Sequence, residues 1–309
     1  MGIFPLDRSS RPGVFFVRMV EQMIRLMELE EVIETTFLSP WVPESIPLSL
    51  VLVGASGTGK SKVLLQYHSP SVHRTNDITT AGLAELMQDD KESKIRHILI
   101  PDFNLVMSHR PATTTLTVAS LLSLMSEGIM RIDDGRVKKD VVHAPIGLIT
   151  AMTRDIYEES ASRFRKLGLS RRFIPIFYSY SILTRELIQN EIKKGRVTLR
   201  QLQAKQITMP KEIRFVGLNA ISERIAILSR DFADALAMSP AWIRNPHEGT
   251  WKVTPQRGVV PIEFTPHMIL RAMARAHALR ARKKQADGKD FEFLTRFVNF
   301  TNYACPVQL

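Results

Sequence analysis

The chain has 309 residues, and 44% of them are hydrophobic, which is enough to bury a core and excludes a chain that is disordered throughout. Lys and Arg number 42 against 31 Asp and Glu, so the formal net charge is +11. No apolar run approaches the roughly 18 residues that a membrane span needs, and the first residues lack the order of a secretory signal. The single cysteine, Cys305, excludes an internal disulfide and a Cys-based zinc site. These features predict a cytoplasmic protein that does not act at a membrane.

The positive charge is unevenly distributed along the chain. Residues 1–160 carry 16 basic and 20 acidic side chains, a net of −4, whereas residues 161–215 carry 13 and 3, a net of +10. The remaining residues carry 13 and 8, a net of +5. This asymmetry predicts a polyanionic partner for the C-terminal half, and a solvated basic surface is the alternative.

Residues 14–37 have apolar side chains at helical spacing and predict an amphipathic helix. A segment with three prolines leads into the apolar run 48–53, which predicts a buried parallel strand. Up to residue 181, short apolar runs then alternate with helical stretches, as is typical of a parallel sheet covered by helices on both faces. Three further strands are predicted, at residues 96–101, 144–151 and 173–178.

Beyond residue 181 the patterns predict helices only, with a long loop between the second and the third. These helices are predicted at residues 182–194, 211–238 and 265–283, and the loop at 239–262. The chain is therefore predicted to contain an N-terminal helix and proline-rich linker (1–47), an αβα core (48–181) and a helical C-terminal segment (182–309).

Residues 54–61, Gly-Ala-Ser-Gly-Thr-Gly-Lys-Ser, match the G-x-x-x-x-G-K-[ST] pattern of a phosphate-binding loop in full. The motif follows a predicted strand and opens a predicted helix, as the pattern requires. Its glycines allow backbone N–H groups to point at phosphate oxygens, Lys60 would reach the β- and γ-phosphates, and the Ser61 hydroxyl would bind Mg²⁺. The other residues predicted to bind the nucleotide are Gly54, Ser56, Gly57, Thr58, Gly59 and Lys62.

Asp102 ends the apolar run 96–101 and is the candidate for the second Mg²⁺ ligand. The next residue is Phe103, where a second carboxylate would polarise the attacking water. The activating base is therefore Asp102 itself, or a residue from elsewhere such as Glu127. Slow hydrolysis that acts as a timer is a further alternative.

The order of these motifs resembles the AAA+ ATPases, a class of P-loop NTPase, over roughly residues 45–285. The motifs are the phosphate loop, the strand before Asp102, the polar-ended Leu148-Ile-Thr-Ala-Met-Thr153, and Gly168-Leu-Ser-Arg-Arg-Phe173 before a helical tail. The resemblance implies an α/β fold in which an αβα core is followed by an all-helical lid. It also implies ATP and Mg²⁺ as ligands and a homo-oligomer in the form of a hexameric ring or spiral.

The resemblance also implies roles for particular residues. Thr150, or else Thr153, matches the sensor-1 residue that contacts the γ-phosphate or water. Arg172, or else Arg171, matches the arginine that completes a neighbouring subunit's site, where a planar cation stabilises charge on the transferred phosphoryl group. The lid arginine is Arg271 or Arg275.

Asp134-Gly135 between alternating residues predicts a hairpin directly before the sensor-1 strand. It resembles the pre-sensor-1 hairpin that helicase- and chaperone-type AAA+ proteins project into a central pore. Arg136, Lys138 and Lys139 would there face a nucleic-acid backbone, and an ordinary surface hairpin is the alternative. Residues 271–284 carry six cations and no acid, which predicts further phosphate contacts.

Together these patterns predict an oligomeric AAA+ ATPase that remodels DNA or RNA in replication, recombination or transposition, with possible helicase or translocase action. The style of the sequence resembles that of phage or mobile-element proteins. A protein-remodelling AAA+ chaperone is the first alternative. The second is a switch that assembles on ATP, recruits a protein partner and hydrolyses slowly.

Overall fold

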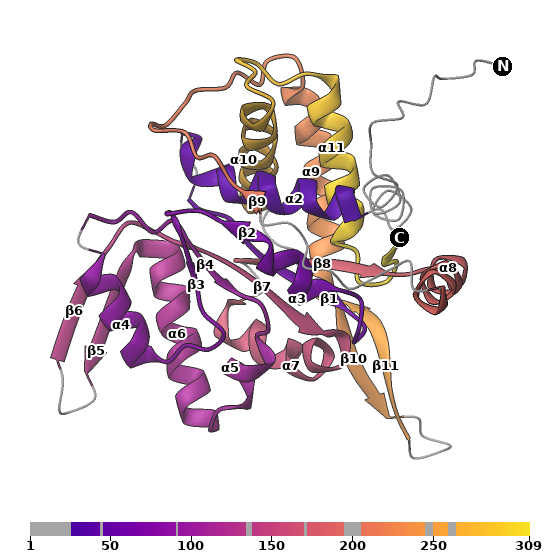
Figure 1. Ribbon diagram of the computed structural model, residues 1–309, viewed down its shortest axis with the longest axis horizontal. Helices are drawn as coiled ribbons and strands as arrows, with labels where there is room; N and C mark the ends of the chain where they lie inside the picture. Colours follow the sequence, from indigo (N-terminus) through magenta and orange to yellow (C-terminus); the bar gives the residue numbers. More distant parts are fainter. Residues whose placement is uncertain are drawn as a thin grey trace.

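A six-stranded parallel sheet lies at the centre of the molecule, in the order β12-β8-β1-β7-β4-β3 (Figure 1). The computed structural model describes residues 26–43, 46–90, 92–133, 138–169, 172–194, 205–244, 250–258 and 264–309. The strands are β1 (Ser49–Gly54), β3 (Val72–Arg74), β4 (His97–Ile100), β7 (Gly147–Thr153), β8 (Phe173–Ser179) and β12 (Val307–Gln308). The predicted α/β class and the four predicted strands are thus confirmed.

Helices on both faces bury the sheet, which explains why its strands read as apolar runs. In β1, Leu50 and Leu52 belong to one hydrophobic core, while Val51 and Val53 belong to a second core on the opposite face. Successive side chains of a strand point to opposite faces, so a strand covered on both sides must be apolar throughout. The short strands β3 and β12 were not predicted, because two or three residues carry no readable pattern.

Four helices cover the face that Val51 and Val53 share (Figure 1). They are α4 (Thr80–Asp89), α5 (Asn104–Ser108), α6 (Pro111–Glu127) and α7 (Arg154–Leu167). Local signals set their ends: the Thr79 hydroxyl accepts from the Gly82 N–H at the start of α4, and Gly128 ends α6 in the left-handed conformation.

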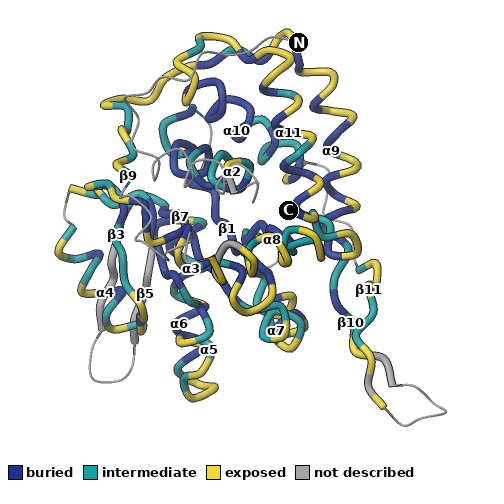
Figure 2. The backbone as a smooth tube through the Cα atoms, turned by 45° about the vertical axis from the view of Figure 1, so that its right-hand side comes forward, coloured by how far each residue is buried: buried dark blue, intermediate teal, exposed yellow. Residues whose placement is uncertain are grey.

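The opposite face carries helices from both ends of the chain. They are α2 (Leu26–Leu38), α3 (Lys60–Leu65), α9 (Ser222–Ala237), α10 (Phe264–Arg280) and α11 (Gly288–Phe300). α2 packs against α10, which is buried along most of its length (Figure 2). One hydrophobic core contains residues of α2, of the sheet and of α9–α11. α2 therefore docks on the chain's own core, and residues 14–25 of the predicted first helix lie outside the described residues.

The segment after residue 181 is not all helical, so that part of the fold prediction is wrong. It begins with α8 (Ile182–Lys193), but β10 (Met238–Arg244) and β11 (Trp251–Arg257) then form an antiparallel hairpin within the predicted loop 239–262. Pro240 pairs with Pro255 in this hairpin, and a two-stranded ribbon has free edges that tolerate proline. β9 (Lys205–Gln206) pairs with β2 (Tyr67–His68), and β12 joins the central sheet.

The predicted hairpin before β7 is confirmed in its backbone. β5 (Ile129–Asp133) and β6 (Lys138–Val142) pair antiparallel and lie beside α4 (Figure 1). His143, just after β6, is tied to Asp90 at the end of α4 by a 3.0 Å contact. Arg136 and the side chains of Lys138 and Lys139 lie outside what the structure describes, so their predicted nucleic-acid contacts stay a prediction.

Within the described ranges, no helix is both long enough and apolar enough to cross a membrane. Cys305 is free and exposed.

Candidate functional site

The phosphate-loop motif lies where β1 ends, at the middle of the sheet. β7 and β8 flank β1, and α3 begins at Lys60. Gly57 and Gly59 have φ angles of +77° and +80°, which only glycine adopts without strain. Gly54 is needed for a different reason, because a Cβ there would lie 3.0 Å from the Tyr178 carbonyl oxygen.

Lys60 is held inside the loop. Its side chain is only 7% exposed, and its ammonium donates to the carbonyl oxygens of Gly54 (2.8 Å) and Ala55 (2.7 Å) and contacts the Thr58 hydroxyl (3.4 Å). Burial lowers the pKa of Lys60, and the nearby Asp102 carboxylate opposes this shift. The loop thus has a positive charge at its centre, close enough to Asp102 for the two charges to interact.

The fold brings Ser61 and Asp102 together, although 41 residues separate them in the sequence. The Ser61 hydroxyl donates to the Pro101 carbonyl oxygen over 2.9 Å, and Asp102 is the next residue. One Asp102 oxygen accepts from the Asn104 N–H (3.0 Å), where α5 begins. A hydroxyl and a carboxylate are the oxygen ligands that Mg²⁺ prefers, so these residues fit the predicted metal. Among the described residues no group of three or more His, Cys, Asp or Glu could hold a metal, so this pair would need phosphate and water oxygens to complete a site.

Phe103 and Asn104 follow Asp102 and face different surroundings. Phe103 is 1% exposed and packs in the core, with its ring centre 6.1 Å from that of Phe173. The position where a second acid was expected therefore belongs to the hydrophobic core. The Asn104 Oδ1 is buried and has no hydrogen-bond partner among the described residues, so it is an acceptor that the motif did not single out.

Thr150 and Thr153 lie at different depths along β7. Thr150 is fully buried, pairs in register with Ile100, and donates its hydroxyl to the Ile100 carbonyl oxygen over 2.6 Å. Thr153 pairs in register with Gly54, the first residue of the loop, and is partly exposed. Thr153, the second choice from sequence, is thus better placed than Thr150 to face a γ-phosphate.

Arg172 and Glu127 lie near the N-terminal ends of the strands, at the opposite end of the sheet from the loop. Arg172 directly precedes β8, whose first residue Phe173 pairs with Ser49 at the start of β1. Arg172 is therefore separated from Gly54 by about six residues along the strand direction, or roughly 20 Å. Glu127 ends α6 close to Ile146, before β7 begins, so it cannot act as a base at this chain's own loop. Arg171 lies outside the described residues.

The two candidate lid arginines lie on α10. Arg275 is 6% exposed, donates to the Pro43 carbonyl oxygen over 3.2 Å and lies 5.5 Å from the Phe215 ring centre. These contacts hold it within the helical layer. Arg271 is half-buried on the same helix. The role of either residue at the loop stays a prediction.

Two tyrosines at the end of β8 contact the loop and were not predicted. The hydroxyls of Tyr178 (3.4 Å) and Tyr180 (3.1 Å) both donate to the Thr58 carbonyl oxygen. Burial raises the pKa of Tyr180 to about 12, so its hydroxyl remains a proton donor at neutral pH. Only the pairing of β8 with β1 brings these residues to Thr58, so no local sequence pattern indicates that they are neighbours.

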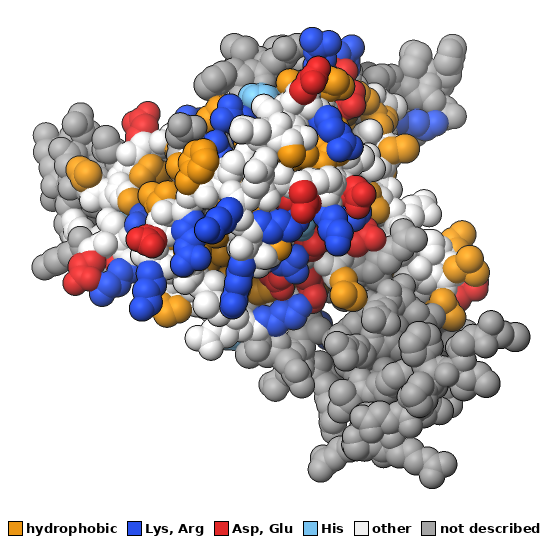
Figure 3. All heavy atoms as spheres, turned by 90° about the horizontal axis from the view of Figure 1, so that it is seen from above, with side chains coloured by type: hydrophobic (Ala, Val, Ile, Leu, Met, Phe, Trp, Pro, Cys, Tyr) orange, Lys and Arg blue, Asp and Glu red, His pale blue; other side chains and the backbone are white. Residues whose placement is uncertain are grey.

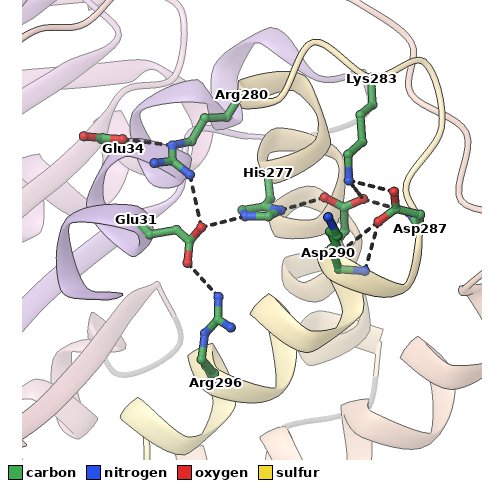
Figure 4. Close-up of polar contacts among 9 residues, drawn as sticks. Glu31, Glu34, His277, Arg280, Lys283, Asp287, Asp290 and Arg296 are labelled. Carbon is green, nitrogen blue, oxygen red and sulfur yellow. Dashed lines mark hydrogen bonds and ion pairs between the residues drawn. The ribbon is translucent and has the colours of Figure 1, made fainter. Parts of the chain in front are cut away.

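Within the described residues, two of the six cations of the basic stretch 271–284 pair with acids of the chain, and the predicted phosphate contacts of the stretch stay a prediction. Figure 3 shows Lys and Arg side chains interspersed with Asp and Glu on the upper face. Arg280 pairs with Glu31 and Glu34 of α2, and Lys283 pairs with Asp287 and Asp290 (Figure 4). Partners from distant segments could not be read from the local sequence.

A scan against protein-family models finds no match for this chain, and a search of curated proteins also returns none.

Proposed function

We propose that this protein is a Mg²⁺-dependent ATPase of the P-loop NTPase class, acting as an oligomer of the AAA+ kind on DNA or RNA. The observation that carries the proposal is the grouping of Lys60 and Ser61, after β1, with Asp102, after β4. A complete phosphate-loop motif, two glycines with positive φ and an acid next to Ser61 are what binding of a nucleoside triphosphate with Mg²⁺ requires.

The place of β7 supports the AAA+ resemblance. β7 lies between β1 and β4, so its C-terminal end adjoins both the loop and Asp102. A residue that contacts the γ-phosphate or the attacking water must lie between these two groups. Thr153, level with Gly54, meets this requirement.

The residues divide the chemistry among them. Lys60 would exchange its contacts with the loop carbonyls for phosphate oxygens and so stabilise their charge. Mg²⁺, held by Ser61 and Asp102, would neutralise the charge that develops on the phosphates. Asp102 has a second oxygen with which to orient water, and the free Asn104 oxygen lies two residues further along.

The nucleic-acid part of the proposal rests on charge and on the hairpin before β7. Residues 161–215 carry a net charge of +10 and the hairpin has its expected place before β7. A slow ATP-dependent switch is the second candidate function, because the buried Phe103 replaces the expected water-activating acid.

Binding and turnover of ATP should be measured together, with sedimentation in the presence of an ATP analogue and Mg²⁺. Turnover should also be measured with single- and double-stranded DNA at several salt concentrations, because phosphate contacts weaken steeply with salt. Stimulation by DNA at low salt supports the remodelling role. Stable assembly with little turnover supports the switch instead. If DNA at low salt does not change the turnover, this result would contradict the nucleic-acid part of the proposal.

Lys60→Ala should lower ATP affinity at least about 100-fold, because it removes the only side-chain cation held inside the described loop. Equilibrium binding of a fluorescent ATP analogue measures this. Lys94→Ala is the matched control, since Lys94 is exposed and pairs only locally with Glu92. Unchanged binding by Lys60→Ala protein would contradict the site.

A further inference from the structure

A cavity of about 690 Å³ lies on the helical side of the sheet, and no residue of the phosphate-loop motif lines it. Its walls come from α2, from β2, from residues 205–214 and from the C-terminal end of α10. Cavities of about 300–1,000 Å³ are typical of small-molecule sites. This one is therefore large enough for a ligand of nucleotide size.

Backbone hydrogen bonds fix residues 205–214 as one wall of this cavity. The Lys205 N–H donates to the Gln66 carbonyl oxygen (2.7 Å), and the Ile207 N–H donates to that of His68 (3.0 Å). At the other end of the wall, the Arg214 N–H donates to the Trp41 carbonyl oxygen over 2.9 Å. The wall is thus anchored at both ends and does not depend on side-chain contacts alone.

The charged side chains around the cavity favour an anion. Five cations and one acid line it, which gives 5 − 1 = +4; the cations are Lys205, Lys211, Arg214, Arg280 and Arg282, and the acid is Glu34. Lys205 and Arg280 pair with acids of α2. Lys211, Arg214 and Arg282 are exposed, and their side chains form no ion pair with any residue in the described part of the chain. Three cations are therefore available to a ligand.

The backbone conformation of Arg282 is a further indication of a ligand site at this cavity. Arg282 has a φ of +57°, in the left-handed conformation that follows the end of α10. Glycine is the usual residue at such a position, and a strained side chain there is often found at a functional site. An arginine at this turn places a planar cation at the rim of the cavity.

Tyr67 supplies a second, independent indication of a ligand. Its side chain is fully buried and its ring packs against Phe37, with 5.5 Å between ring centres. Among the described residues no partner lies within ordinary hydrogen-bond distance of its hydroxyl, although the Gln66 side chain is close enough to oppose the rise of its pKa, and Tyr67 lines the cavity. A buried polar group without a partner is unfavourable, so an acceptor within the cavity would stabilise it. Burial also raises the pKa of Tyr67, so the hydroxyl stays a neutral donor.

We propose that this cavity binds a phosphate group carried by an organic ligand. Phosphate offers about two charges and three acceptor oxygens, which suits two arginines, a lysine and a tyrosine hydroxyl better than a carboxylate does. Leu38, Ile207, Met209 and Leu279 give the cavity an apolar part for the rest of the ligand. The phosphate belongs either to a free phosphorylated molecule or to the end of a nucleic-acid strand. This site is independent of the proposed ATPase function.

The test uses the Lys60→Ala protein, so that the phosphate loop does not compete for the probes. The probes are inorganic pyrophosphate, adenosine monophosphate and a 5′-phosphorylated single-stranded octanucleotide, titrated by calorimetry at low salt. We expect saturable binding of pyrophosphate and of at least one of the other two. Tighter binding of the monophosphate identifies a free ligand, and tighter binding of the phosphorylated over the unphosphorylated octanucleotide identifies a strand end.

Two variants connect the binding to this cavity. Tyr67→Phe removes one hydroxyl, and we expect about tenfold weaker binding without loss of thermal stability. The triple variant Lys211→Glu, Arg214→Glu and Arg282→Glu should abolish binding. Its matched control changes three exposed cations elsewhere by the same charge: Lys166→Glu, Arg230→Glu and Lys289→Glu.

Absence of saturable binding, or equal binding by the triple variant and its control, would overturn the proposal. A failure of wild-type protein to bind or hydrolyse ATP would count against the ATPase alone, because these titrations do not use the phosphate loop.

Discussion

Phe103 directly follows Asp102, and its side chain points into the hydrophobic core instead of toward the loop. A glutamate introduced there would be buried among apolar side chains and would not reach the attacking water. Phe103→Glu should therefore lower the free energy of unfolding by at least about 3 kcal/mol without raising ATP turnover. Denaturant unfolding and a turnover assay measure the two effects. Phe103→Leu, the apolar control, should lower the free energy of unfolding by less than about 1.5 kcal/mol. A Phe103→Glu protein that folds and hydrolyses ATP faster than the wild type would contradict this assignment.

Asp102 has both a local and a proposed chemical role. One of its oxygens caps the backbone of Asn104, and an amide oxygen can accept the same hydrogen bond. Asp102→Asn should therefore change the free energy of unfolding by less than about 1 kcal/mol, while ATP hydrolysis falls at least about 100-fold. Stopped assays of hydrolysis with parallel ATP-binding titrations separate the two effects. Hydrolysis at the wild-type rate would show that another acid holds the metal and water.

At the scale of elements, α2 is held on the helical layer by a charged network. His277 of α10 contacts Asp290 of α11 (2.6 Å) and Glu31 of α2 (3.1 Å), one through each ring nitrogen (Figure 4). Glu31 also contacts Arg280 and Arg296, and Asp290 contacts Lys283. With a carboxylate at each nitrogen, the imidazole must donate from both and so is protonated.

This network predicts a defined pH dependence of stability. Burial lowers the pKa of His277, but its hydrogen bonds to Asp290 and Glu31 outweigh burial and raise the pKa above 6.5. The His277 contribution is therefore complete below pH 6.5 and is lost as pH rises through the raised pKa. The hydrogen bond from His277 lowers the pKa of Glu31 from 4.5 to about 2, so the Glu31 contribution is lost as pH falls from 4.5 toward 2. Both contributions are present between about pH 4.5 and 6.5.

His277→Gln should accordingly destabilise the protein by about 1–2 kcal/mol at pH 5.5 and by less at pH 9. Thermal unfolding of both proteins at the two pH values measures the difference. His68→Gln, in an exposed position on β2, is the control and should show no such dependence. An equal loss at both pH values would mean that His277 acts through packing on Phe293, whose ring is stacked 4.1 Å away.

At the scale of the whole molecule, the position of Arg172 decides how it can act. It lies at the N-terminal ends of the strands, roughly 20 Å from the phosphate-loop motif of its own chain, which follows the C-terminal end of β1. An arginine there can complete a nucleotide site only in a neighbouring copy of the chain. Arg172→Ala should therefore lower hydrolysis about 1,000-fold or more and leave ATP binding nearly unchanged.

Mixing two inactive variants tests this directly. In an equimolar mixture of Lys60→Ala and Arg172→Ala subunits, some sites combine an intact Lys60 with a neighbour's intact Arg172. A closed ring with random assembly should recover about a quarter of wild-type turnover. Failure of the mixture to exceed the two separate proteins would contradict a role in a neighbouring subunit.

The sequence by itself determined the features that depend on contiguous residues. The glycine conformations of the phosphate-loop motif, the strand before it and the buried character of the sheet follow from glycine at positive φ and from apolar runs, which are local properties. Asp102 could be chosen because it ends such a run. The hairpin before β7 was predictable because its pairing partners are close in the chain.

Only the tertiary structure decided which distant groups meet. It placed Thr153 instead of Thr150 level with the loop, brought Tyr180 to Thr58 and paired Arg280 with Glu34, 246 residues away. It also formed strands in the segment predicted as a helical lid. Each outcome depends on strand order and helix packing, which combine contributions from the whole chain. A cation has the same local sequence whether it faces solvent or an acid from another helix, so the net charge of +11 alone could not locate a binding surface.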